Sequence, residues 1–285
     1  MVEISVQIVT RGESTLSQVL EALRCDRFVD AEVVVVDSSG RELPRGQRDR
    51  ELIDQYLTTR PETSLLDARR LGVTVSRGPK SLLLDSTRVV SVGLLRELVQ
   101  SHSKDPMVII PEVGSGHTFW AIQGTWDKQI VNQRRFLERA IHSARPFVLP
   151  RYFDTQLLRR VYSTLLHRAG QESLSKVVYS DHSLVYLTAL ELWPHVAICQ
   201  DGWISHTEDA KLGDVVRKYK RYGESSRVLK ASAPDLLRAA RSHGLDASSV
   251  GLELTRALVQ PLHLMRFLSY MMGYVGGSLT KMNGK

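Results

Sequence analysis

The segment Ser81–Val90 reads Ser-Leu-Leu-Leu-Asp-Ser-Thr-Arg-Val-Val. Its apolar run stops abruptly at the carboxylate of Asp85. A parallel strand that is covered on both faces has such a continuous run, and open α/β sheets bind ligands beyond the carboxyl ends of their strands. The segment therefore predicts a buried parallel strand that delivers Asp85 to a ligand site. The alternative is that Asp85 only caps the next segment.

A strand–helix–strand pattern precedes this segment. Residues 4–9 predict the first strand, and residues 32–37 predict the second. Between them, residues 15–24 predict a helix, for which Ser14 is the expected N-cap. A strand, a helix and a strand within about thirty residues form a right-handed parallel crossover.

The second predicted strand also ends at a carboxylate. Asp37 follows four valines and precedes the turn residue Ser38. Because the carboxyl ends of parallel strands meet at one edge of a sheet, we expect Asp37 and Asp85 to face the same crevice. The alternative for Asp37 is a turn-forming role ahead of Ser38.

The remaining pattern extends this α/β arrangement to about Pro111, after which the regular alternation fades. Helical periodicity and apolar runs predict further elements. The expected helices cover residues 45–57, 65–75, 94–99, 129–144, 153–168 and 181–192, and the expected extended segments cover 107–111, 147–150 and 196–200.

The composition is that of an ordinary soluble chain that can bury a large core. The chain has 285 residues, is 42% apolar and has a formal net charge of +7. Its two cysteines, Cys25 and Cys199, have no metal-binding spacing and suit a reducing compartment, and the first residues do not resemble a signal peptide. We therefore expect a cytoplasmic protein.

Net charge favours polyanionic partners but does not choose among them. Nucleic acid is disfavoured because the chain lacks an aromatic RNP pattern, a KH-type loop and zinc-finger spacing. A Rossmann dehydrogenase or methyltransferase is disfavoured because residues 10–14, after the first strand, lack the Gly-x-Gly-x-x-Gly turn.

The C-terminal third combines a basic segment with an apolar one. Lysines and arginines gather in residues 211–241, as a solvated helix face or as a contact for phosphates. Residues 251–280 are apolar, but Pro261 and several glycines interrupt them, so they are unsuited to span a bilayer. The alternatives are a helix lying in the membrane interface, an ordinary packing helix or a homodimer contact.

The order of these pieces resembles the family 2 glycosyltransferases, in particular the membrane-linked members from archaea and bacteria. These are inverting enzymes with the GT-A fold, an α/β fold with a Rossmann-like, mainly parallel central sheet flanked by helices. The matching segments are residues 4–11 (first strand), 33–40 (second strand), 68–72 (Ala-Arg-Arg-Leu-Gly), 84–87 (Leu-Asp-Ser-Thr, at the Asp-x-Asp metal motif), 180–181 (Ser-Asp, at the family's Glu-Asp pair), 202–206 (Gly-Trp-Ile-Ser-His) and 217–223 (Arg-Lys-Tyr-Lys-Arg-Tyr-Gly).

The resemblance implies a role for each matching position. Asp181 would be the catalytic base. The donor would be bound by Thr10, Arg11, Asp37, Arg69, Asp85, Lys218, Arg221 and Tyr222, and a Mg²⁺ or Mn²⁺ ion by Asp85, Thr87 and His206. Outside the matching segments, the aromatic pair Phe119 and Trp120 could form a stacking floor for the acceptor sugar.

Two departures from the family pattern bear on the metal and the base. Thr87 replaces the second aspartate of the metal motif, and Ser180 replaces the glutamate of the pair. A neutral hydroxyl is a weak ligand for a hard cation, so metal affinity should drop or another ligand such as His206 must complete the set. Alternatively, side-chain cations neutralise the diphosphate, and the candidates are Arg88, Lys218 and Arg221.

Each role has a plainer alternative. Asp181 could simply cap its helix, and His206 could be a hydrogen-bonded structural residue. Phe119 and Trp120 could belong to the core, and Arg69 and the basic helix could be solvated.

The sequence therefore predicts an inverting, GT-A-like glycosyltransferase that transfers a sugar from a UDP- or GDP-linked donor to a hydroxyl of a glycan or lipid-linked acceptor. We expect a nucleotide-sugar half over residues 1–110, an acceptor and catalytic half over 111–225, and a helical extension over 226–285 that contacts the inner face of the cell membrane or forms a dimer. The alternative is a catalytically degenerate GT-A-like protein that binds a nucleotide sugar or a glycan.

Overall fold

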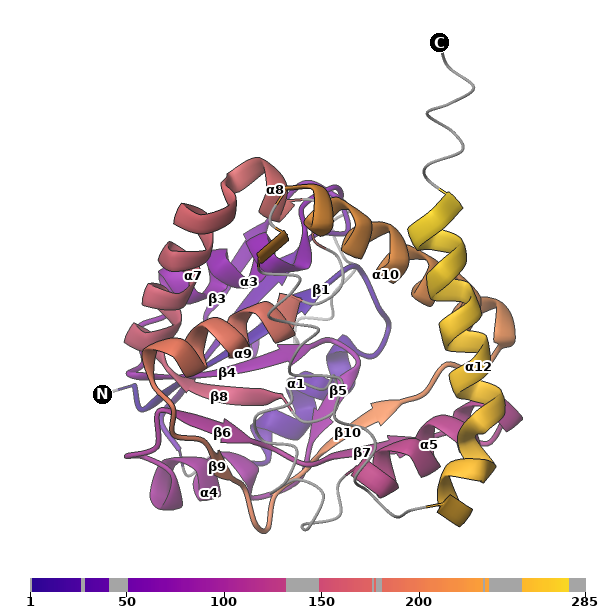
Figure 1. Cartoon of the computed structure of the whole chain (residues 1–285). Coiled ribbons are helices and arrows are strands. Elements are labelled where there is room, and N and C mark those ends of the chain that lie inside the picture. The colour runs from indigo at the N-terminus through magenta and orange to yellow at the C-terminus, as the bar shows by residue number, and fades with distance from the viewer. Residues whose placement is uncertain are drawn as a thin grey trace.

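The structure is a computed structural model that describes residues 2–26, 29–40, 51–131, 149–175, 177, 181–232, 234–235 and 253–276. A seven-stranded sheet forms its centre, with helices on both faces (Figure 1). In spatial order the strands are β3 (Gln55–Thr58), β2 (Ala31–Asp37), β1 (Ile4–Thr10), β4 (Lys80–Asp85), β8 (Pro150–Asp154), β6 (Met107–Ile109) and β9 (Ala197–Ile198).

The first four strands of this order run parallel to one another, and β8 runs antiparallel to β4 and to β6. A small second sheet follows the order β5 (Arg88–Val90), β10 (Ile204–Thr207) and β7 (Glu112–Ser115). The helices are α1 (Leu16–Arg24), α3 (Leu65–Val75), α4 (Leu94–Ser101), α5 (Phe119–Val131), α7 (Thr155–Ala169), α8 (Gln171–Ser175), α9 (Asp181–Leu192), α10 (Leu212–Ser232) and α12 (Glu253–Gly276).

Strand β4 is buried on both faces, as its leucine run predicts. Leu82 and Leu84 pack into the core that α1 and α4 cover, whereas Leu83 packs into the core that α3, α7 and α9 cover. All three leucines are no more than 1% exposed. Successive side chains of a strand point to opposite faces, so only a run without polar interruption can satisfy both cores.

Register places two carboxylates at the same sheet edge. Strand β1 pairs Thr10 with Asp37 of β2 and Val9 with Asp85 of β4. The parallel crossover between β1 and β2 is confirmed, and so is the strand end at Asp85.

Several sequence expectations are wrong in detail. The helix expected over residues 45–57 is replaced at its end by strand β3, while residues 41–50 lie outside the described residues. The N-cap of α1 is Thr15 rather than Ser14, and its side chain makes no capping hydrogen bond. The segments expected at 147–150 and 153–168 begin later, as β8 and α7.

The helix that begins with Phe119 and Trp120 also differs from expectation. Helix α5 begins at Phe119 and is described to Val131, and the rest of the helix expected over 129–144 lies outside the described residues. The boundary expected between residues 225 and 226 falls inside α10, which is one continuous helix.

Helices α10 and α12 cross in direct backbone contact (Figure 1). A Cβ atom built at Gly223 would lie 1.9 Å from the carbonyl oxygen of Tyr270, and one built at Gly273 would lie 1.8 Å from that of Lys220. Asp127 of α5 accepts from Arg266 at 2.6 Å and pairs with His263 at 2.9 Å, which anchors α12 to the rest of the molecule. Among the described helices, none is both long and apolar enough to cross a membrane.

Gly223→Ala should separate α10 from α12, because the added methyl group overlaps a backbone atom that has no room to move. We expect a loss of about 1–3 kcal/mol in the free energy of unfolding, as for other overpacked sites, and faster proteolysis of the C-terminal helices. Urea denaturation and limited proteolysis measure both. Gly213→Ala is the control, since a Cβ at that position of the same helix meets no atom within 4 Å. Equal stability of the two variants would contradict the close crossing.

Candidate active site

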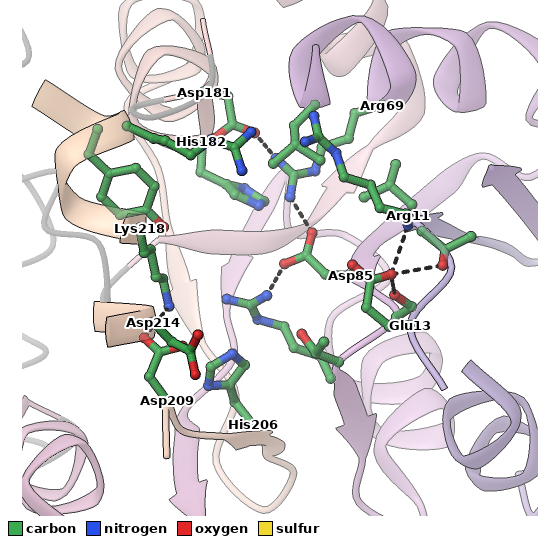
Figure 2. Close-up of a pocket in the computed structure, with 18 of the residues that line it drawn as sticks. Arg11, Glu13, Arg69, Asp85, Asp181, His182, His206, Asp209, Asp214 and Lys218 are labelled. Atoms are coloured by element: carbon green, nitrogen blue, oxygen red, sulfur yellow. Dashed lines mark hydrogen bonds and ion pairs between the residues drawn. The ribbon is translucent and has the colours of Figure 1, made fainter. Parts of the chain in front are cut away.

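A cavity of about 700 Å³ opens at the carboxyl ends of β1 and β4. Helix α10 and the segment before it form its opposite wall (Figure 2). Eleven of the candidate residues predicted from the sequence line this cavity: Thr10, Arg11, Arg69, Asp85, Thr87, Arg88, Asp181, His206, Lys218, Arg221 and Tyr222.

The turn after β1 is fixed by Glu13. One carboxylate oxygen of Glu13 accepts from the hydroxyl of Thr10 at 2.9 Å, the backbone N–H of Arg11 at 2.7 Å and the hydroxyl of Ser86 at 2.6 Å. Burial would raise the pKa of Glu13, but these hydrogen bonds outweigh it and lower the pKa. Glu13 is therefore an anion that joins the ends of β1 and β4 and holds Arg11 at the cavity wall.

Arg69 of α3 joins two carboxylates from separate elements. Its guanidinium pairs with Asp85 at the end of β4 and with Asp181 at the start of α9 (Figure 2). Its side chain is only 4% exposed, and burial lowers its pKa to about 9, so it is still a cation at neutral pH. Asp85 and Asp181 are thereby held on one side of the cavity.

Asp85 carries a second guanidinium. Arg88, three residues later on β5, pairs with the other oxygen of Asp85 and reaches Glu112 of β7 at 3.3 Å. Burial lowers the pKa of Arg88 to about 10, which leaves it protonated at neutral pH. Both oxygens of Asp85 therefore face fixed cations.

Behind Arg88, buried charges alternate in sign. Glu112 pairs with Arg151 of β8 and lies 3.4 Å from Lys128 of α5, and Lys128 lies 2.7 Å from Glu208. Burial would raise the pKa of Glu112, but Arg151, Arg88 and Lys128 hold it well below its ordinary value. These ion pairs tie the small sheet to α5 and support the cavity floor.

Two neutral imidazoles face the cavity. Burial lowers the pKa of His206 to about 4 and that of His182 well below its ordinary value, in the latter case aided by nearby arginines. His206 Nδ1 lies 3.2 Å from Glu208 and donates to it because a carboxylate only accepts. His182 Nε2 lies 3.2 Å from a guanidinium nitrogen of Arg151, so this ring nitrogen is the acceptor.

The wall formed by α10 supplies exposed cations. Lys218 donates to Asp209 at 3.1 Å, and the side chain of Arg217 is 74% exposed. Arg11 lies close enough to Arg221 that, after burial, repulsion from Arg221 lowers the pKa of Arg11. Two like charges facing each other across a cavity form a site that an anion would stabilise.

Three selected residues do not line the cavity. Asp37 is at the same sheet edge, but it is 1% exposed and accepts from the backbone N–H of Ser39 and the hydroxyl of Tyr56. Phe119 and Trp120 lie at the start of α5 in edge-to-face contact, 5.0 Å apart, and Phe119 is 57% exposed. Of the two strand-end carboxylates expected to face one crevice, Asp85 therefore lines the cavity, together with Asp181, and Asp37 does not.

Other charged groups were missed by the sequence analysis. Glu112 follows the strand ending at Ile109 much as Asp85 ends β4, so the strand-end rule could have found it. For Glu208, the only sequence signal was its position two residues after His206. Arg151 and Lys128 carry no local signal, because their partners are distant in the sequence.

The residues expected to hold Mg²⁺ or Mn²⁺ fit that role poorly. Asp85, Thr87 and His206 all line the cavity, but the carboxylate of Asp85 is shared by two guanidinium groups. A hard cation needs oxygen ligands with accessible lone pairs. We therefore derive no chemical step through a metal ion in this cavity.

No protein-family model matches the chain, and no curated protein matches its sequence. Solved structures do match it. S. aureus TarS 1–349 in complex with UDP has a TM-score of 0.53 at 14% identity, covering 99% of this chain and 92% of that chain. S. aureus TarS 1–349 has a TM-score of 0.52 at 14% identity, covering 96% and 81%, and its complex with UDP-GlcNAc has a TM-score of 0.51 at 14% identity, covering 95% and 81%.

These structural neighbours are GT-A glycosyltransferases. At 14% identity the likeness establishes the fold alone. The α/β fold with a mainly parallel central sheet and a helical C-terminal part is therefore the GT-A fold, as the sequence predicts.

Proposed function

We propose that the protein is an inverting glycosyltransferase that transfers a sugar from a nucleoside-diphosphate donor to a hydroxyl acceptor. The observation that carries this proposal is the pairing of Asp85 and Asp181 through Arg69, at the strand-end cavity of a GT-A fold. Assignment to family 2 belongs to the same proposal and rests on the sequence motifs.

The donor diphosphate would bind between Arg11 and Arg221. Their mutual repulsion is relieved by an anion, and guanidinium groups match phosphate oxygens in a bidentate geometry. Lys218 and Tyr222 line the same wall, so they would contact the donor from α10. The complexes of TarS with UDP and UDP-GlcNAc support UDP-linked sugars as the first donors to test.

Asp181 would act as the general base. It is 7% exposed, lies at the start of α9, and faces the cavity beside Arg69 (Figure 2). An ion pair requires the ionised carboxylate, which is the form that accepts a proton. In one displacement the acceptor oxygen bonds to the anomeric carbon, its proton passes to Asp181, and the bond to the diphosphate breaks with the electron pair on the diphosphate.

Two neutral histidines complete the lining of the cavity around the proposed reaction. His206 and His182 carry no charge at neutral pH, so they can donate or accept hydrogen bonds without repelling the cationic transition state. Asp85, fixed by Arg69 and Arg88, would orient the donor's ribose or sugar hydroxyls through its remaining acceptor capacity.

The competing proposal is a degenerate GT-A protein that binds a nucleotide sugar without transferring it. Thr87 in the metal motif supports it, as does Ser180, which lies outside the described residues. Transfer and hydrolysis of UDP- and GDP-linked sugars, each with Mg²⁺, with Mn²⁺ and with EDTA, separate the two proposals. Binding without turnover in every arm would favour the degenerate protein.

Peripheral contact with an anionic membrane is part of the proposal. Helix α12 exposes a band of large apolar side chains, and α10 beside it carries exposed lysines. The apolar residues are Leu264, Phe267, Leu268, Met271, Met272 and Val275. Apolar insertion combined with basic attraction is the usual mode of interfacial helices.

Asp181→Asn should lower turnover by at least about 10²-fold, since the amide cannot accept the acceptor's proton. Donor affinity, measured by calorimetry, should change little. Asp154→Asn is the matched control, because Asp154 begins α7 as its N-cap and does not line the cavity. Turnover of Asp181→Asn equal to that of Asp154→Asn would remove Asp181 from the role of base.

Arg221→Ala should weaken UDP binding about tenfold or more, since it removes a charged hydrogen-bond donor worth about 1.5–3 kcal/mol. Isothermal titration with UDP, in EDTA and in Mg²⁺, measures the change and the metal requirement together. Lys220→Ala is the control, because Lys220 is exposed on the same helix but does not line the cavity. Equal losses in both variants would indicate a general charge effect and contradict the assigned contact.

Exchanging Phe267 and Met272 for serine should weaken co-sedimentation with phosphatidylserine vesicles, because they are two of the six exposed apolar side chains named on α12. Trp193→Ser is the control, since Trp193 is 49% exposed after α9. If the unmodified chain does not co-sediment with such vesicles, membrane contact is contradicted. The remaining alternative for this surface is a homodimer contact, and light scattering would show whether the same substitutions dissociate a dimer.

A further inference from the structure

Three potential metal ligands meet at a place separate from the active-site cavity. Glu97 and His102 come from α4 and its C-terminal cap, and Cys199 follows β9. One ligand atom of each residue lies within 4.8 Å of the other two, and none of the three lines the active-site cavity. His102 is 8% exposed and Cys199 is 2% exposed, so the cluster is largely shielded from water.

The imidazole of His102 is oriented as a metal ligand usually is. Its Nδ1 lies 2.7 Å from a carboxylate oxygen of Asp105 and donates to it, because the carboxylate can only accept. The Nε2 atom points to Glu97, with 4.0 Å between Nε2 and Oε1. A carboxylate that fixes the tautomer through the other ring nitrogen is the common outer partner of a metal-bound histidine.

Glu97 is also fixed in place. The backbone N–H groups of Gln200 and Asp201 donate to its Oε1 at 2.9 and 3.1 Å. Its other oxygen and the Cys199 sulfur lie beside Gly202, where an added Cβ would be 2.9 Å from Glu97 Oε2 and 3.2 Å from Cys199 Sγ. The same Cβ would lie 2.4 Å from Leu94 Cδ1, so the glycine lets the backbone pack closely against two of the three ligand atoms.

The set of donor atoms selects the type of ion. A thiolate, an imidazole and a carboxylate together suit Zn²⁺ and similar borderline transition metals, whereas Mg²⁺ and Ca²⁺ prefer oxygen alone. Three protein ligands would leave a fourth, tetrahedral position for water. We propose that Glu97, His102 and Cys199 bind a Zn²⁺-class ion that joins α4 to the connection between β9 and β10.

Binding would exchange one proton for the ion. Without metal, burial and the hydrogen bond to Glu97 raise the pKa of the Cys199 thiol to about 12, so it is protonated. Metal binding would form the sulfur–metal bond and release this proton to solvent. The segment that follows Cys199 leads directly into β10, which carries the cavity-lining residue His206. By fixing this segment to α4, the ion would stabilise the position of β10 without entering the cavity.

Cobalt reports this site directly, and the test does not depend on the proposed glycosyl transfer. EDTA-treated full-length protein is titrated with Co²⁺, and we expect one equivalent to bind with a thiolate-to-cobalt absorption band, which Zn²⁺ then displaces. Cys199→Ser should remove the band. Cys25→Ser is the matched control, since Cys25 is the other cysteine, is exposed and lies outside the cluster.

His102→Gln keeps the test decisive if Cys199→Ser fails to fold. It should weaken Co²⁺ binding about tenfold or more while leaving Cys199 in place. Zn²⁺ should raise the thermal midpoint of the wild-type protein and of Cys25→Ser, but not that of His102→Gln. No sulfur–cobalt band in the wild type, or a band that is lost with Cys25 rather than Cys199, would overturn the proposal and leave a thiol–carboxylate hydrogen bond only.

Discussion

The buried guanidinium of Arg69 is the constraint on which the site depends. It pairs with carboxylates from β4 and α9, and a buried charge is tolerated only when it is paired. Removing one member of such a pair typically costs about 3–5 kcal/mol, because the other charge is left uncompensated. Asp85, Asp181 and the helix that carries Arg69 are therefore held together as a unit, whatever ligand occupies the cavity.

The two walls of the cavity differ in physical character. On the sheet side, Glu112 and Lys128 are almost fully buried and Arg88 is partly buried, and the three alternate in charge, so each restricts its neighbours. On the side of α10, Arg217 and Arg221 are exposed and can change rotamer at little cost. A fixed wall suits the alignment of reacting atoms, and an adaptable one suits the capture of a charged donor.

Sequence patterns predicted those helices and strands that are specified by residues close together in the sequence. The leucines before Asp85 specified a strand between two cores, and helix α3 begins and ends where its periodicity predicted. The error at β3 reflects its place at the edge of the sheet, where Gln55 to Thr58 are never fully buried and no continuous apolar run marks the strand. The network around Glu112 was not predictable in the same way, since Arg151 and Lys128 become its partners only through the tertiary fold.

The departure at Thr87 is best understood together with Arg88, the next residue. In the resembling family a divalent cation would balance the charge at this position, and here Arg88 and Arg69 occupy both oxygens of Asp85. A metal ion would have to displace ion pairs that are each costly to break in a buried site, whereas a guanidinium cannot dissociate from the chain. The geometry thus favours neutralisation by arginine. Under the proposed function, Arg11 and Arg221 would supply the positive charge that balances the diphosphate in place of a metal ion at Thr87.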